Sequence, residues 1–118
     1  PVPLHRWRLW RRGFNQAAVL GRELSRLTGA GMLVDALERR KATPVLGGLG
    51  ASARRRTLTG AITVNPRWAA RLRGARVLLV DDVLTSGATT DACVSVLKRS
   101  GVKVVRIACF ARVLDEAL

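Results

Sequence analysis

Two adjacent carboxylates and a run of small hydroxyl residues lie close together in the second half of the chain. Asp81 and Asp82 follow the apolar run 77–80, and Thr-Ser-Gly-Ala-Thr-Thr occupies residues 85–90. Carboxylate oxygens suit sugar hydroxyls or the water shell of Mg²⁺, and they repel phosphate. Small residues at a helix start let backbone N–H groups approach an anion, which the helix dipole also attracts. The residue types therefore predict a phosphorylated sugar that binds together with a metal ion, with the hydroxyls of this run as added donors.

The flanking sequence places these residues between a predicted strand and a predicted helix. Residues 77–80 are consecutive apolar residues, as in a buried parallel strand, and 91–99 carry apolar side chains at helical spacing. A ligand site is one interpretation. The other is structural, because strands followed by capped helices occur throughout α/β proteins, and acids there can simply satisfy helix-end N–H groups. The chain lacks the Gly-x-x-x-x-Gly-Lys-Ser/Thr and Gly-x-Gly-x-x-Gly patterns, which disfavours P-loop and dinucleotide sites.

The other segments alternate between predicted helices and strands. We expect a helix over 14–28 that Gly29 ends, strands near 32–37 and 61–64, a helical turn at 68–73, and a last strand over 102–113. Residues 39–56, rich in glycine, read as a long mobile loop. The pattern predicts an α/β domain with a parallel sheet and helices on both faces, and a ligand site at the carboxyl ends of its strands.

Length and composition limit the class of protein. The 118 residues suit one domain, 1–118, with 48% hydrophobic content typical of a globular chain. No apolar run approaches the roughly 18 residues of a membrane span, so no membrane association is expected. Cys93 and Cys109 fall in an apparent helix and an apparent strand and read as small core residues, which fits a cytoplasmic protein. The chain opens on Pro-Val-Pro-Leu, which reads as the tail of a truncated first strand in a fragment of a longer protein.

The positive charge is concentrated in the first part of the chain. The net charge is +13; residues 1–76 carry 16 Lys and Arg against three acids, whereas residues 77–118 carry five of each. Such a field attracts pyrophosphate, nucleotides or nucleic acid. Genome composition is the alternative source of the scattered arginines. Trp7 and Trp10 lie among the first basic residues, where they either stack a base or pack the loop against the body.

The order of apolar strand, two acids and hydroxyl–glycine–hydroxyl loop over 77–90 resembles the phosphoribosyl pyrophosphate (PRPP) signature of type I phosphoribosyltransferases. The resemblance implies that Asp81 and Asp82 hold ribose hydroxyls and contact Mg²⁺ indirectly, through its water. It implies that the loop holds the 5′-phosphate. The residues that it assigns to PRPP are Asp81, Asp82, Leu84, Thr85, Ser86, Gly87, Ala88 and Thr89.

Further motifs resemble the ComF/GntX group of phosphoribosyltransferase-like proteins. They are Pro-Val-Pro-Leu-His-Arg-x-Arg-x-x-x-Arg-Gly-Phe-Asn-Gln-Ala at 1–17, Ala-Arg-Arg-Arg at 53–56 with Leu-Thr-Gly-Ala at 58–61, and Ala-Arg-Val at 111–113. The resemblance implies that cations near the N-terminus face pyrophosphate and that a basic lid closes over the substrate, with Arg56 joining the two acids in catalysis. The pyrophosphate residues are His5, Arg6 and Arg8, and the lid residues are Arg54, Arg55 and Arg56.

The chain departs from the group in three respects. Thr57 stands where the group usually has Asn, and Ile62 where it usually has Phe. Because of these two departures, the resemblance does not determine the state of the lid. The N-terminal zinc module common in the group is absent from this sequence, so no zinc is expected. The group is linked to bacterial competence and DNA uptake, which implies competence proteins as partners, with a homodimer as another arrangement.

Two functions are therefore predicted. In the first, the chain binds PRPP with Mg²⁺ and transfers the phosphoribosyl group to an unknown acceptor, with release of pyrophosphate. In the second, the fold is a non-catalytic module that senses PRPP or a nucleotide, or that binds single-stranded DNA weakly during uptake, since basic grooves with aromatic residues bind single strands. Only turnover separates the two.

Overall fold

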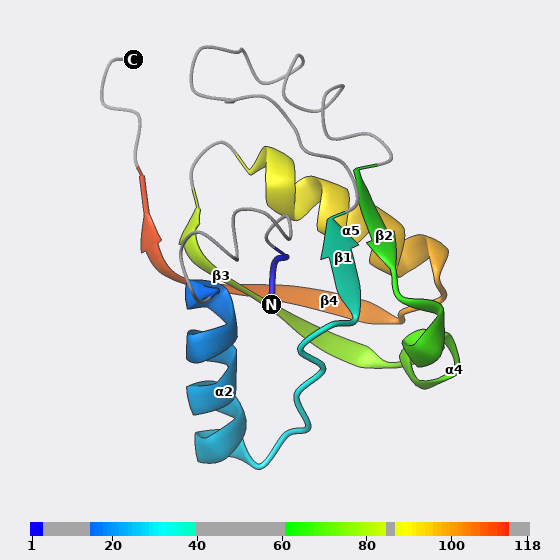
Figure 1. Cartoon of the computed structure of the whole chain (residues 1–118), viewed down its shortest axis with the longest axis horizontal. Helices are drawn as coiled ribbons and strands as arrows, with labels where there is room; N and C mark the ends of the chain where they lie inside the picture. The colour runs from blue at the N-terminus through cyan, green and yellow to red at the C-terminus, as the bar shows by residue number, and fades with distance from the viewer. Residues whose placement is uncertain (4–14, 40–60, 85–86, 114–118) are drawn as a thin grey trace.

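The computed structural model describes residues 1–3, 15–39, 61–84 and 87–113 (Figure 1). Within these ranges no helix is long and apolar enough to cross a membrane. The elements, in chain order, are helix α2 (Gln16–Thr28), strands β1 (Leu37–Arg39) and β2 (Ile62–Val64), the 3-10 helix η1 (Pro66–Trp68), helix α4 (Ala69–Leu72), strand β3 (Arg76–Leu84), helix α5 (Ala88–Arg99) and strand β4 (Val104–Arg112).

A parallel pair of strands forms the centre of the domain. β3 pairs with β4 from Arg76 opposite Val104 to Leu84 opposite Arg112, and α5 connects the two strands. The strand–helix–strand order confirms the predicted parallel sheet. β3 is longer than the apolar run 77–80, because its backbone pairing with β4 continues past the acids. Asp81 and Asp82 therefore lie within the strand rather than after its end.

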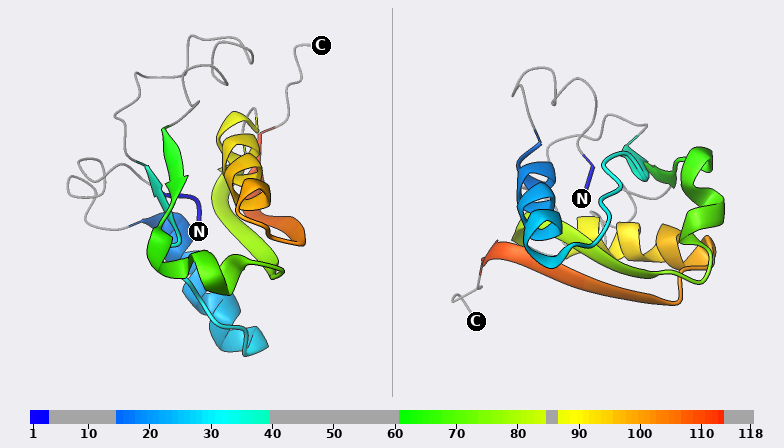
Figure 2. Two further views of the ribbon diagram at one scale, coloured as in Figure 1. Left: turned by 90° about the vertical axis from the view of Figure 1, so that its right-hand side faces the viewer. Right: turned by 90° about the horizontal axis from the view of Figure 1, so that it is seen from below.

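Helices α2 and α5 cover opposite faces of β3, as predicted (Figure 2). Successive side chains of a strand point to opposite faces. Leu79, 2% exposed, belongs to the same core cluster as Cys93 and Leu97 of α5. The next residue, Val80, approaches Gly21 of α2: a Cβ built on that glycine would lie 4.0 Å from Val80 Cγ2.

Helix α2 ends before Gly29 as predicted, but it begins at Gln16, two residues later than the predicted start at 14. The Asn15 side chain accepts hydrogen bonds from the N–H groups of Ala17 and Ala18, and Gly29 ends the helix with φ +76°. Asn15 also donates from Nδ2 to the Val2 carbonyl over 3.0 Å, while the Val2 N–H donates to the Val80 carbonyl over 2.8 Å. The cap thus fixes residues 1–3 beside β3.

The small antiparallel sheet β1–β2 packs against α5 through Leu37 and Ile62. The strand predicted near 32–37 is shifted, since residues 34–36 turn and β1 begins only at Leu37. A residue distant in the chain stabilises this turn, because Asp35 accepts a hydrogen bond from Trp68 Nε1 at 2.7 Å. The predictions of a strand at 61–64 and a helical turn at 68–73 are confirmed by β2, η1 and α4.

Candidate functional site

A small pocket lies at the carboxyl end of β3, where the fold predicts a ligand. Its volume is about 170 Å³, and it joins residues from four separate parts of the chain. Its lining consists of Val2, Pro3, Arg39, Asp81, Val83, Leu84, Gly87, Thr89 and Thr90. The structure thus brings together four of the residues that the sequence assigned to PRPP: Asp81, Leu84, Gly87 and Thr89. Asp82 and the buried Ala88 are not part of the lining.

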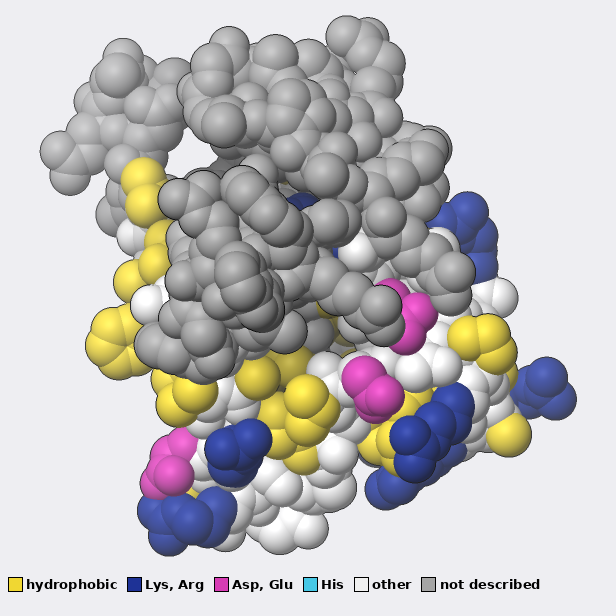
Figure 3. All heavy atoms as spheres, in the orientation of Figure 1, with side chains coloured by type: hydrophobic (Ala, Val, Ile, Leu, Met, Phe, Trp, Pro, Cys, Tyr) yellow, Lys and Arg dark blue, Asp and Glu magenta, His cyan; other side chains and the backbone are white. Residues whose placement is uncertain are grey.

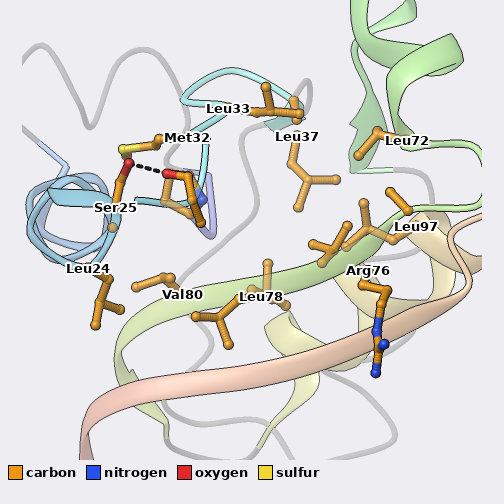
Figure 4. Close-up of a pocket in the computed structure, with 18 of the residues that line it drawn as sticks. Leu24, Ser25, Met32, Leu33, Leu37, Leu72, Arg76, Leu78, Val80 and Leu97 are labelled. Atoms are coloured by element: carbon orange, nitrogen blue, oxygen red, sulfur yellow. Dashed lines mark hydrogen bonds between the residues drawn. The ribbon is translucent and has the colours of Figure 1, made fainter. Parts of the chain in front are cut away.

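A larger cavity of about 360 Å³ lies between α2 and β3 (Figure 4). Figure 4 shows apolar side chains around it, among them Leu24, Leu78 and Val80. Its lining includes the charged side chains of Arg71 and Arg76 but no carboxylate. Carboxylate oxygens are the groups expected to bind ribose hydroxyls and hydrated Mg²⁺. The smaller pocket, which contains a carboxylate, is therefore the better candidate for the predicted sugar-phosphate site.

Asp81 is the acid that faces the smaller pocket. Its side chain is partly buried, and its Oδ1 accepts a hydrogen bond from the Asp82 N–H at 2.9 Å. The pKa of Asp81 is raised to about 6, mainly by burial and secondly by the neighbouring Asp82. The positive charge of Arg39 lowers this pKa. Asp82 in turn accepts from the Val83 N–H at 2.8 Å. The two carboxylates are therefore oriented by the backbone of the strand that carries them.

The raised pKa of Asp81 predicts how stability depends on pH. Between its ordinary value of 3.8 and about 6, the folded chain holds a proton that the unfolded chain has lost. The free energy of unfolding should therefore fall as pH rises through this range. We expect Asp81→Asn to be about 1 kcal/mol more stable than the parent at pH 7, after solvent screening, and equal to it near pH 4. Urea unfolding at both pH values measures this, and an equal difference at both would contradict it.

The loop into α5 is shaped by a glycine. Gly87 has φ +81°, a left-handed conformation that side chains disfavour, and no side chain caps the helix at this position. Its carbonyl accepts hydrogen bonds from the Asp91 N–H at 2.8 Å and from the Thr90 hydroxyl at 2.9 Å. The N-terminus of a twelve-residue helix thus opens on the pocket, the arrangement that binds phosphate elsewhere.

Thr90 differs from the expectation for the hydroxyl run. It is 2% exposed, and its hydroxyl donates to the Gly87 carbonyl rather than to a ligand position. The residue therefore holds the loop in shape. Thr89, which is partly exposed and lines the pocket, keeps the predicted position of a donor.

Arg39 is a pocket residue that sequence reasoning missed. The sequence placed it at the start of a mobile loop, whereas the structure places it at the end of β1, opposite Ile62 of β2. Its charge lowers the pKa values of both Asp81 and Cys93. It is the cation of the pocket among the described residues. Its position directly after an apolar segment was the available signal, but nothing local connects it to acids 42 residues later.

Removing the charge of Arg39 should change the titration of the pocket. We expect Arg39→Gln to raise the pKa of Asp81 further, because the opposing cation is lost, whereas Arg39→Lys should leave it near the parent value. Carboxyl chemical shifts followed against pH by NMR measure both variants. An unchanged Asp81 midpoint in Arg39→Gln would show that the two side chains do not interact.

The two cysteines have different environments. Cys93 of α5 is completely buried, and burial raises the pKa of its thiol to about 12, so it is a neutral core residue as predicted. Cys109 was also predicted to be a core residue, and this is wrong, because it is exposed on β4. β4 is an outer strand of the described sheet, so the apolar sequence around Cys109 does not produce burial there.

Several predicted site residues lie outside the described residues. They are His5, Arg6 and Arg8 of the pyrophosphate segment, Trp7 and Trp10, Thr85 and Ser86 of the phosphate loop, and Arg54, Arg55 and Arg56 of the lid. Their assignments stay predictions. Within the described part of the chain, no group of three or more His, Cys, Asp or Glu side chains could hold a metal ion. The oxygen donors of Asp81 and Asp82 fit the water shell of a Mg²⁺ ion that a phosphorylated ligand carries.

Comparison with known proteins gives one consistent result. The family model of the phosphoribosyl transferase domain matches residues 11–118. "Competence protein F" of Haemophilus influenzae is 38% identical over 112 residues, which are 95% of this chain and 48% of that protein. "DNA utilization protein YhgH" is 37% identical in Escherichia coli O157:H7 and 34% identical in Salmonella typhi, each over 96% of this chain and 48% of the relative.

This chain thus spans about half the length of the curated relatives it matches. No solved structure matches it. The family match covers the parallel strands, α5 and every pocket residue except Val2 and Pro3, and so includes the strand–acids–loop–helix order that had indicated a phosphoribosyl ligand. The chain is similar to a competence protein and to DNA-utilization proteins, and it belongs to the phosphoribosyl transferase domain family.

Proposed function

We propose that the chain binds PRPP together with Mg²⁺ and transfers its phosphoribosyl group to an acceptor, with release of pyrophosphate. The observation that carries the proposal is the pocket in which Asp81 and the N-terminus of α5 at Gly87 lie side by side. A carboxylate suits the ribose hydroxyls, and a helix N-terminus suits the 5′-phosphate. Together, the carboxylate and the helix N-terminus fit a ligand that carries a phosphate next to a group of hydroxyls.

The proposed reaction requires positioning and charge stabilisation rather than covalent catalysis. A nucleophilic nitrogen forms a bond to the anomeric carbon while the bond from that carbon to the pyrophosphate oxygen breaks, and pyrophosphate leaves with the electron pair. Asp81 and Asp82 orient the ribose, and backbone N–H groups at 85–89 hold the 5′-phosphate. His5, Arg6 and Arg8, with Arg56 of the lid, stabilise the charge that grows on pyrophosphate. Bound Mg²⁺ would neutralise part of that charge, and its water shell would rest on the two acids.

One experiment separates transfer from binding alone. The protein is incubated with PRPP, Mg²⁺ and a panel of nucleobases and simple amines, and pyrophosphate release is followed together with calorimetric PRPP binding. Release that depends on the acceptor supports the transferase. Mg²⁺-dependent binding without release supports the sensing module instead, and absence of binding contradicts both.

Single-stranded DNA handling is the second candidate function. It is favoured by the net charge of +13, with all of the excess in residues 1–76, and by the names of similar proteins, which concern competence and DNA utilization. A polyanion would be attracted to this part of the chain at long range. Recognition by charge predicts little preference for base sequence.

Salt dependence tests this second function. We expect micromolar or weaker affinity for a single-stranded oligonucleotide, falling steeply with salt by roughly 0.7 log units per log of salt for each neutralised phosphate. Replacing Arg54, Arg55 and Arg56 together by Gln should reduce the slope by about two if the DNA contacts all three side chains, and should leave the slope unchanged if the DNA binds at a surface away from the lid. Fluorescence anisotropy at a series of salt concentrations measures the slope. No binding at low salt would remove DNA handling as a function of this domain.

A further inference from the structure

A group of exposed cations surrounds the amino ends of the two parallel strands, at the opposite end of the sheet from the pocket. They come from η1, from α4 and the residue after it, from the start of β3, from the last turn of α5 and from the turn into β4. We call this group the cationic edge: Arg67, Arg71, Arg73, Arg76, Lys98, Arg99 and Lys103. In Figure 3, Lys and Arg side chains gather at the lower right of the visible face, on the side where Figure 1 places α4.

The backbone holds the two halves of the cationic edge together. The Gly74 N–H donates to the Gly101 carbonyl at 2.7 Å, and the Lys103 N–H donates to the Ala75 carbonyl at 2.8 Å. The side chain of Arg73 packs against Gly101, in the turn between α5 and β4: a Cβ built on Gly101 would lie 3.4 Å from Arg73 Cγ. The segment before β3 and the segment before β4 are therefore joined by hydrogen bonds, and their cations lie on one surface.

The charges of the cationic edge are not neutralised by the described part of the protein. None of the seven forms an ion pair with a described carboxylate, and the ion pair between Arg26 and Glu23 lies on α2. Arg67 and Arg71 stack on Trp68, with guanidinium carbons 5.0 Å and 5.9 Å from the ring centroid. Such stacking orients a guanidinium and leaves its N–H donors available.

We propose that the cationic edge binds the phosphate backbone of a single-stranded nucleic acid. The inference rests on the DNA-handling function proposed above and adds its location. Several arginines on one surface provide bidentate donors for successive phosphates, and contacts to phosphate carry no direct sequence information. Charge complementarity therefore selects a phosphodiester chain without selecting its sequence.

The cationic edge and the pocket lie at opposite ends of β3. β3 runs nine residues from Arg76 to Leu84, so the two ends of the strand lie about 25 Å apart. A strand of DNA on the cationic edge leaves the pocket open. PRPP and DNA should accordingly bind at the same time, each with the affinity it has alone.

The test compares two variants with the same loss of charge. The edge variant carries Arg73→Gln, Arg76→Gln and Lys103→Gln, and the control carries Arg22→Gln, Arg26→Gln and Arg112→Gln, which are exposed cations elsewhere. Anisotropy of a labelled twenty-residue oligothymidylate is measured at several salt concentrations. We expect the salt slope to fall by about two in the edge variant and to stay near the parent value in the control.

The remaining measurements separate this inference from the proposed functions. Calorimetric PRPP binding should be unchanged in the edge variant, and saturating PRPP should not displace the oligonucleotide. Equal slope losses in the two variants, or displacement by PRPP, would overturn the location while leaving DNA binding by the chain intact. Binding of inorganic polyphosphate without binding of the oligonucleotide would overturn nucleic acid as the ligand. Circular dichroism of both variants confirms that they are folded.

Discussion

The double variant D81N/D82N is expected to lose Mg²⁺-dependent PRPP binding, by about 100-fold or more, while the domain stays folded. Two charge-assisted hydrogen bonds to ribose hydroxyls, each of about 1.5–3 kcal/mol, account for a loss of that size. Folding should not suffer, because burial and the adjacent Asp82 already disfavour the charged form of Asp81. Isothermal calorimetry with and without Mg²⁺ measures the affinity, and thermal unfolding measures the stability.

Single variants show which acid is responsible. Asp81 lines the pocket and Asp82 does not, so Asp81→Asn should cause the larger part of the loss. Asp91→Asn serves as the matched control, since this exposed acid lies in the first turn of α5 and outside the pocket lining. Unchanged PRPP affinity in the double variant would show that the pocket is not the ribose site.

The second large effect is expected at Gly87. A valine there would have to adopt φ +81° and would place its side chain at the start of α5, where the phosphate is proposed to meet the backbone. The strain should cost about 1–3 kcal/mol of stability. The loss of two or more backbone hydrogen bonds to an anion should cost about 100-fold in PRPP affinity.

Gly74 offers a control for the strain alone. It has a similar φ of +73°, has no atom within 4 Å of a built Cβ, and lies at the other end of β3. Gly74→Val should therefore lose comparable stability and keep PRPP binding, with calorimetry performed well below both melting temperatures. If a folded Gly87→Val protein binds PRPP like the parent, the loop is a helix cap and nothing more.

Much of the site could be predicted from the sequence because its central part is continuous in the chain. The strand, the acids, the glycine and the helix all lie between residues 76 and 99, so local periodicity and chain connectivity bring Asp81 close to Gly87. The helix before Gly29 was also predicted, since its apolar spacing and that glycine are local signals, although its start was placed at 14 rather than at Gln16. The alternation of helices and strands indicated the parallel pair.

Contacts between distant segments were decided only by the tertiary structure. Arg39 enters the pocket because β1 pairs with β2, and the extent of β3 follows from its pairing with β4. Thr90 is turned inward by its bond to the Gly87 carbonyl, and Cys109 is exposed because β4 lies at the edge of the described sheet. Hydrophobic periodicity reports which face of an element is apolar, but it does not report which partner pairs with its backbone. The sequence by itself thus determined the strand–acids–loop–helix order of the phosphoribosyl signature, because that order is local in the chain, whereas backbone pairing between distant strands determined which charges surround it.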